Sequence, residues 1–158
     1  MGSRGRISAV PRSAHLDASE AGRPASAAAK VIGVYCRGVR GATTVEANTR
    51  EAILSATEDL LRAILESNNL TRQDIASVIF TTTRDLNAEF PAVAAREMEW
   101  TDVPLLCGHE MNVPGSLQMC LRVLMHVNTE KTAAEMVHVY LNGAKILRPD
   151  KEDQSFRS

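Results

Sequence analysis

The 158-residue sequence is poor in aromatic side chains and in net charge, and each shortage excludes a class of function. Aromatic residues make up 4% of the chain, which is too few for the stacking platforms that single-stranded nucleic acids require. The formal net charge of −1 leaves no excess of positive charge to attract a polyanion or an anionic membrane. We therefore expect no nucleic-acid partner and no membrane partner.

Long apolar runs, paired cysteines and phosphate-binding loops are also missing. No apolar run approaches the roughly 20 residues that a membrane-spanning helix needs. Cys36, Cys107 and Cys120 are odd in number and lack CxxC spacing, so we expect reduced thiols in the cytoplasm. The GxGxxG and GxxxxGK patterns of nucleotide-binding loops are not found.

Composition divides the chain into a leader, one domain and a tail. Residues 1–30 are rich in Ala, Ser, Gly and Arg with little apolar periodicity, which is typical of a disordered leader. Its arginines also fit a transit peptide that would direct the protein to a plastid, although Asp17 and Glu20 argue against one. Residues 31–150 have the apolar content of one folded domain, and residues 151–158 are expected to form a loose tail.

Hydrophobic periodicity predicts an α+β domain whose mixed sheet has five to six strands, with one long helix and one or two short ones. Strands are expected at residues 31–39, 76–83, 103–107 and 117–128, and in a hairpin whose arms are 137–141 and 144–147. Asn142-Gly143 would supply the two positive φ angles of a type I′ hairpin turn. Residues 40–46 are expected to lead from the first strand into a turn.

The helix predictions rest on capping residues. The long helix is expected to begin at Asn48, which forms a capping-box pattern with Glu51, and to end at residues 67–69. Thr71 and Asp74 suit the start of a short helical turn. Pro91 suits the first turn of a short helix that runs to about Met98.

The segment 104–128 holds a carboxylate and an arginine that the fold could bring together. Apolar and polar residues alternate from Leu117 to Asn128, with Leu124 the one exception, and this period of two predicts a strand with one buried face. Arg122 then projects from the opposite face, and Glu110 lies at the corner before the strand. The two side chains could face one pocket or form a structural salt bridge, and the pattern alone leaves both open.

Other reactive side chains give weaker signals. Cys107 and His109 could act as nucleophile and base, or could bind zinc with Cys120, but no third orienting group and no paired zinc knuckles are evident. His126 and His138 are interpreted as structural. Several residues near element ends could form a cationic pocket for a small dicarboxylate, namely Arg40, Arg96, Arg122 and Arg148 together with Glu110 and Tyr140.

Five blocks in order resemble the trimeric, mixed α/β class of monofunctional chorismate mutase, which is unrelated to the all-helical mutases. They are VRGATTVE (39–46), TRDLNAEFPA (83–92) with ARE (95–97), VPLLCGHEM (103–111), CLRV (120–123), and HVYL (138–141) with LRPD (147–150). Together they span about residues 34–150, so the resemblance covers the whole domain.

The resemblance implies a homotrimer whose sheets form a pseudo-barrel, with an active site in each cleft between neighbouring subunits. It implies the pericyclic conversion of chorismate to prephenate in phenylalanine and tyrosine biosynthesis, with no metal and no cofactor. A non-catalytic trimeric protein that binds carboxylates or senses a metabolite, or a scaffold that uses strand 117–128 only as an interface, remain alternatives.

The resemblance also assigns roles by position. Arg40 and Tyr140 would bind the enolpyruvyl carboxylate, Arg122 the ether oxygen of the breaking bond, and Glu110 with Cys107 the ring hydroxyl. Leu147 would line the pocket, Arg148 would lie near the cleft, and the neighbouring subunit would lend Phe90, Ala92 and Arg96. The chain departs from the family pattern at Val93, at Leu106 and in a loop before Trp100 that is one residue shorter.

Overall fold

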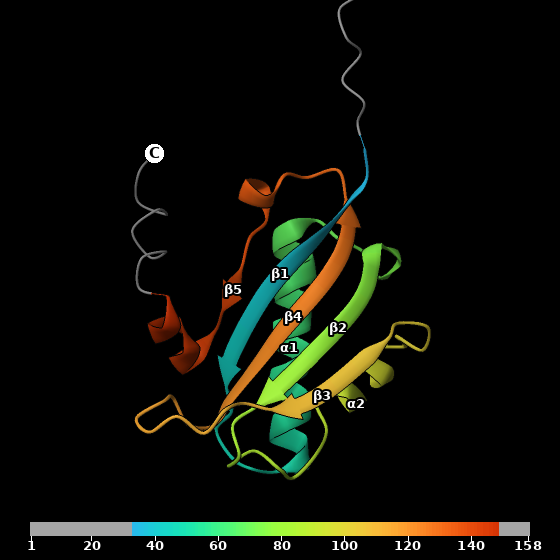
Figure 1. Cartoon of the computed structure of the whole chain (residues 1–158). Helices are drawn as coiled ribbons and strands as arrows, with labels where there is room; N and C mark the ends of the chain where they lie inside the picture. Colours follow the sequence, from blue (N-terminus) through green and yellow to red (C-terminus); the bar gives the residue numbers. More distant parts are fainter. Residues whose placement is uncertain (1–32, 149–158) are drawn as a thin grey trace, which may run out of the picture. The chain divides into compact units, whose positions relative to one another are not determined.

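Five strands and two α-helices form two layers in the computed structural model, which describes residues 33–148 (Figure 1). The strands are β1 (Tyr35–Thr44), β2 (Ile75–Thr82), β3 (Leu105–His109), β4 (Cys120–Thr129) and β5 (Val139–Tyr140), and the helices are α1 (Arg50–Asn68) and α2 (Ala92–Glu97). Short 3₁₀ segments follow at Arg72–Asp74, Ala133–Glu135 and Asn142–Leu147. The predicted α+β class is confirmed, while the predicted leader (1–30) and tail (151–158) lie outside the described residues.

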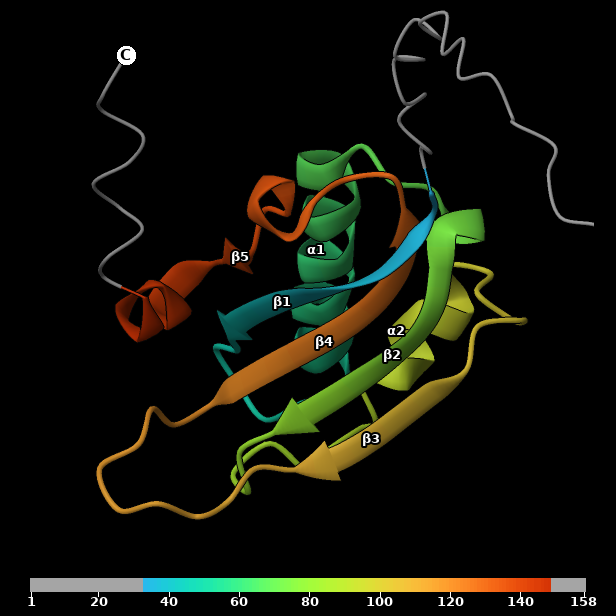
Figure 2. The same ribbon diagram turned by 45° about the horizontal axis from the view of Figure 1, so that its top comes forward.

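The sheet is mixed, with the strand order β3-β2-β4-β1-β5. The central strand β4 runs antiparallel to β1 and to β2, while β3 is parallel to β2 and β5 is parallel to β1. Both α-helices cover one face of the sheet and leave the other face open (Figures 1 and 2). Within residues 33–148 no helix is long and apolar enough to cross a bilayer.

The hydrophobic core lies between α1 and the sheet. Its largest buried side chains are Ile53, Leu60, Leu61 and Ile64 from the helix, and Val39, Phe80, Leu121, Met125 and Val127 from the strands. Gly41 of β1 sets how closely the two layers approach, because a Cβ atom at this position would lie 2.6 Å from Ile64 Cδ1. The glycine therefore lets the helix pack directly onto the strand.

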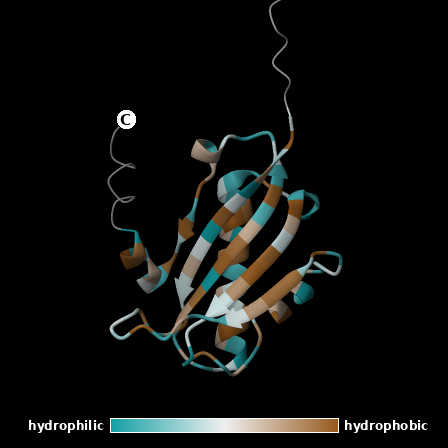
Figure 3. Cartoon of the chain, viewed as in Figure 1, coloured by the Kyte–Doolittle hydropathy of each residue, from teal (hydrophilic) through white to brown (hydrophobic). Residues whose placement is uncertain are grey.

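The alternation predicted along the segment 117–128 is confirmed for β4. Leu121, Val123, Met125 and Val127 are buried beneath the helices, whereas the residues between them lie on the open face. Figure 3 shows both hydrophobic and hydrophilic bands along this strand, and the alternation is interrupted where Leu124 follows Val123. Arg122 belongs to the open face, as the period of two predicts.

Helix α1 begins one residue later than the sequence suggests. Thr49, not Asn48, is the N-cap, and its hydroxyl accepts a hydrogen bond from Ala52 N at 3.2 Å. Asn48 instead uses its side-chain oxygen to accept hydrogen bonds from the backbone N–H groups of Asn87 and Ala88, each at 2.9 Å. The predicted end of the helix is confirmed, since Asn69 has a φ of 49° and caps the last turn.

Strand β1 extends beyond the predicted range of 31–39 to Thr44 before the chain turns, because Arg40–Thr44 pair in register with β4. The prediction of a hairpin at 137–147 is wrong, because Asn142 has a positive φ of 50° but Gly143 does not. Asn142 Nδ2 donates to Thr43 Oγ1 and Gly143 N donates to Thr44 Oγ1, so contacts with β1 hold this segment as a 3₁₀ helix.

Candidate active site

The strand register gathers polar side chains on the open face of the sheet. Arg122 of β4 lies opposite Ala42 of β1 on one side and Thr81 of β2 on the other. Tyr140 of β5 lies opposite Ala42 in turn, so the row across the sheet reads Tyr140, Ala42, Arg122, Thr81. Arg40 is two residues before Ala42 on β1 and therefore lies on the same face.

A cavity of about 450 Å³ opens over this row. It is lined by six of the ten residues that the resemblance singles out, namely Arg40, Glu110, Arg122, Tyr140, Leu147 and Arg148. Three guanidinium groups against one carboxylate make the lining cationic, and the volume suits a small molecule. This chemistry fits an anion with more than one carboxylate.

Arg122 and Glu110 are close but are not hydrogen-bonded. Arg122 Nε lies 3.6 Å from Glu110 Oε1, which is an ion-pair distance. The Nε atom is buried and has no hydrogen-bond partner within residues 33–148. The two side chains keep 39% and 26% of their surface exposed. The alternatives that the sequence left open are therefore both true, since the pair faces one cavity and forms a loose salt bridge.

Glu110 is held by two consecutive residues of β2. Its backbone N–H donates to the Thr82 carbonyl at 2.8 Å, and its Oε1 accepts a hydrogen bond from the Thr81 hydroxyl. Thr81 also lines the cavity, and the sequence analysis did not single it out. The sequence shows which residues of a strand at 76–83 would share a face, but only the pairing of β2 with β4 places Thr81 beside Arg122.

Two histidines and the last described residues surround the site without adding a reactive group to it. His138 precedes β5 and accepts a hydrogen bond from Arg40 N at 3.1 Å through Nδ1, which supports its structural interpretation. His126 is likewise hydrogen-bonded, with Nδ1 at 3.0 Å from Ser77 Oγ. Leu147 and Arg148 follow in the 3₁₀ segment and close one side of the cavity.

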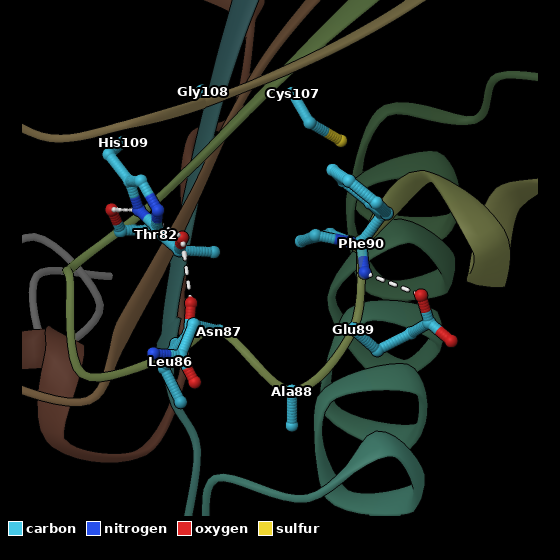
Figure 4. A pocket seen from close by; sticks show the side chains of 10 residues that line it. Thr82, Leu86, Asn87, Ala88, Glu89, Phe90, Cys107, Gly108 and His109 are labelled. Atoms are coloured by element: carbon cyan, nitrogen blue, oxygen red, sulfur yellow. Dashed lines mark hydrogen bonds between the residues drawn. The ribbon is translucent and has the colours of Figure 1, made fainter.

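Cys107 and Phe90 line a different cavity, of about 330 Å³ (Figure 4). Cys107 lies opposite Phe80 of β2, whose side chain is fully buried beneath the helices. Side chains alternate along β3, so Cys107 and Glu110 extend from opposite faces of the sheet. The expectation that these two side chains contact one substrate group is therefore not met within a single chain.

The cysteine and the histidine in this second cavity do not form a nucleophile–base pair. Burial raises the pKa of the Cys107 thiol, and the Ala92 backbone and the charge of Arg96 lower it by less. The thiol is consequently protonated and unreactive at neutral pH. His109 Nδ1 lies 3.2 Å from the Thr82 hydroxyl rather than next to the Cys107 sulfur.

The structure also gives no support to a zinc site at Cys107, His109 and Cys120. No three His, Cys, Asp or Glu side chains of the described chain are placed to bind a metal.

The remaining two predicted site residues lie on α2. Ala92 is buried at the start of the helix, and Arg96 lines a third cavity with Trp100. Neither of them lines the cavity around Arg122 within one chain. The helix itself is confirmed, since Ala92–Glu97 with Pro91 as the preceding cap agrees with the predicted range to within a residue at each end.

The cationic cavity on the open face of the sheet is suited to a small anion, and comparison with known proteins gives the family. Residues 36–151 match the family described as chorismate mutase type I. This chain belongs to that family.

Individual relatives agree with this assignment. The chain is 46% identical over 115 residues to chorismate mutase AroH of Bacillus subtilis, covering 72% of this chain and 91% of the relative. It is 50% identical over 117 residues to chorismate mutase AroH of Thermus thermophilus, covering 73% and 96% respectively. A solved chorismate mutase from Clostridium thermocellum superposes with a TM-score of 0.68 at 54% identity, covering 69% of this chain and 97% of that one.

Proposed function

We propose that this protein is a chorismate mutase, which converts chorismate to prephenate in the biosynthesis of phenylalanine and tyrosine. One observation carries the proposal: Arg122 presents a buried, unpaired Nε in a cationic cavity, opposite a carboxylate. The family assignment and the names of the relatives support the same reaction.

The rearrangement breaks the ether C–O bond of chorismate while a C–C bond forms, and no proton is transferred. In the transition state the ether oxygen gains negative charge and the ring gains positive character. We assign Arg122 to that oxygen, because a fixed guanidinium binds the developing charge better than it binds the ground state. A preorganised donor commonly contributes about 3–4 kcal/mol, against the roughly 8 kcal/mol that a 10⁶-fold acceleration requires.

The other cavity residues are assigned to orientation. Arg40 and Tyr140 would bind the carboxylate of the enolpyruvyl side chain, with Arg148 adding positive charge nearby. Glu110 would bind the ring hydroxyl and stabilise the positive end of the transition state. Holding both ends of the substrate selects the compact conformer that reacts, which is scarce in water.

The activity is tested by following the loss of chorismate absorbance, with prephenate identified by acid conversion to phenylpyruvate. The key variant is Arg122→Ala, which should lose at least about a hundredfold in kcat, in line with the removal of one preorganised donor. Arg62→Ala is the matched control, because Arg62 is an exposed residue of α1 that forms an ion pair with Glu58 and does not line the cavity. An inactive wild-type protein that still binds chorismate would instead support a carboxylate-binding protein.

We also propose a homotrimer in which each cavity is completed by a neighbouring subunit. The exposed apolar residues support this, since Phe90, Leu106 and Leu124 keep 66%, 62% and 36% of their surface accessible in the single chain. Phe90 and Arg96 would enter the cavity from the neighbour, and Ala92, whose side chain is buried, would hold the start of α2 beside them. We place Cys107 with this second group, because it shares a cavity with Phe90 and not with Glu110.

Sedimentation equilibrium of the purified protein tests the assembly, and a monomer at assay concentrations that retains full activity would contradict it.

We further propose a cytoplasmic location. All three cysteines are free thiols, which suits a reducing compartment. Fractionation of the source cells would check the location.

A further inference from the structure

We infer that Thr81 is a positioning residue for the proposed reaction: its hydroxyl holds the Glu110 carboxylate away from Arg122, so that both charges remain available to the substrate. The inference rests on the proposed function and adds to it a residue that lies outside the set implied by the family resemblance.

Thr81 and Arg122 compete for one oxygen atom of Glu110. Glu110 Oε1 accepts the hydrogen bond from the Thr81 hydroxyl, and the same atom is the one nearest to Arg122 Nε, at 3.6 Å. A guanidinium and a carboxylate that are free to pair normally close to about 2.7–2.9 Å and often form two parallel hydrogen bonds. The longer separation means that Thr81, not Arg122, fixes the position of the carboxylate.

The surrounding backbone makes this arrangement rigid. Thr81 lies in the strand register between Gly108 of β3 and Arg122 of β4, so it lines the β2 side of the cavity, next to Arg122. Gly108 has no side chain, so nothing from β3 stands between Glu110 and Thr81. The Thr82 carbonyl meanwhile holds Glu110 N at 2.8 Å. A β-branched residue in a strand also has restricted χ1, so the hydroxyl direction is fixed before substrate binds.

The electrostatic consequence concerns Arg122. A tight bidentate pair with Glu110 would occupy two guanidinium donors and cancel much of the positive field at the point where negative charge develops in the reaction. The buried Nε would then no longer be unpaired. By binding Oε1 with a neutral donor, Thr81 keeps the carboxylate from forming a tight pair with Arg122, so that neither charge is neutralised by close hydrogen bonds to the other.

Removal of the hydroxyl at constant shape is the direct test. In Thr81→Val we expect the carboxylate to close onto Arg122 and kcat to fall about ten- to a hundredfold, which is the range for losing one hydrogen bond to a charged group. KM should change by less than about threefold, because the loss falls mainly on the transition state. Thr81→Ser retains the hydroxyl and should recover most of the activity.

Two controls separate positioning from a general effect on folding. Thr57→Val makes the same substitution in α1, where the hydroxyl donates to Ile53 O at 2.6 Å and does not line the cavity, so its kcat should remain at the wild-type level. The second control is a double-mutant cycle with Glu110→Gln. If Thr81 acts through Glu110, the double variant will be no slower than Glu110→Gln alone, whereas an independent structural effect would add to it.

The outcomes are distinguishable from those of the proposed function. An inactive, folded wild-type protein overturns the proposed function and this inference with it. If the wild type is active, three results would each overturn this inference alone. They are a wild-type kcat in Thr81→Val, a kcat of Thr81→Ser as low as that of Thr81→Val, and additive effects of Thr81→Val and Glu110→Gln in the double variant. If Thr81→Val does not fold, Thr81→Ala removes the same hydroxyl, and the same three comparisons decide.

Discussion

Asp85, in the loop after β2, accepts a hydrogen bond from the backbone N–H of Met119 at 2.8 Å, and so fixes the residue that leads into β4. Met119 has a φ of 50°, a backbone conformation that residues other than glycine rarely adopt. The other carboxylate oxygen accepts a hydrogen bond from Thr83, whose hydroxyl in turn accepts one from Cys120 N at 2.9 Å. Asp85 is thus connected to the backbone two residues before Arg122.

We expect Asp85→Asn to lower the free energy of unfolding by about 1–2 kcal/mol at neutral pH, through loss of charge-assisted hydrogen bonds at a partly exposed site. Burial by itself raises the pKa of Asp85, but the hydrogen bonds from Thr83 and Met119 outweigh burial and hold the pKa below its ordinary value of 3.8. A lowered pKa stabilises the fold above the unfolded pKa, and this contribution is lost as the pH falls through the folded one.

The difference between wild type and Asp85→Asn should therefore be constant near neutral pH and shrink below about pH 4. Urea denaturation of both proteins at several pH values measures it. A difference that is the same at pH 3 and pH 7 would contradict the assigned role of the carboxylate charge.

We expect Arg122→Lys to be nearly as slow as Arg122→Ala. Lysine keeps the positive charge but presents a compact ammonium instead of a planar fork with a buried Nε, so it cannot reproduce the donor geometry at the ether oxygen. Steady-state kinetics of the two variants side by side provide the measurement. Recovery of turnover by lysine to within about tenfold of wild type would show that charge alone is sufficient.

Mixing two inactive variants tests whether the site is shared between subunits. Arg122→Ala damages the cavity on the open face, and Arg96→Ala damages the part assigned to the neighbour. In mixed trimers formed at random from equal amounts of the two variants, about a quarter of the sites would combine an intact Arg122 with an intact Arg96. About a quarter of the wild-type activity should therefore return. Separately purified variants that remain inactive after co-refolding would show that one chain supplies both parts.

We expect Gly41→Ala to destabilise the fold by about 1–3 kcal/mol, the usual cost of overpacking a core. The added Cβ would meet Ile64 Cδ1 at 2.6 Å and Leu60 Cδ1 at 3.1 Å, so α1 must shift or both side chains must change rotamer. Gly38→Ala is the matched control on the same strand, since its Cβ would have one contact, at 3.5 Å from Leu124. Thermal unfolding of the two variants compares them, and equal midpoints would contradict the close approach of α1 to β1.

What the sequence encodes locally was predictable, and what depends on strand pairing was not. The alternation from Leu121 to Val127 is readable in the sequence because burial of one face imposes it, and the end of α1 is readable because Asn69 tolerates a positive φ. The Asn142-Gly143 hairpin failed because its local preference competes with hydrogen bonds to Thr43 and Thr44, 99 residues earlier in the chain.

In the candidate site, too, some features were predictable from the sequence and others depend on strand pairing. A shared location for Glu110 and Arg122 was a hypothesis that the sequence could raise, but the 3.6 Å separation follows from the pairing of β2 with β4. The opposite faces of Cys107 and Glu110 follow from their spacing of three residues once the chain is extended from β3 to Glu110. Thr81 was missed because a threonine in a strand has no distinguishing pattern until its neighbours across the sheet are known.

The strand that carries Tyr140 is joined to the sheet by two residues, whereas β4 is paired along its whole length on at least one side. Local opening needs less free energy where fewer pairs hold an element, so amide hydrogens at Leu141 and Ala144 should exchange faster than those of β4. The cavity therefore lies between the fully paired strand β4 and the weakly paired strand β5. On gradual heating, catalysis should fail before the helices melt.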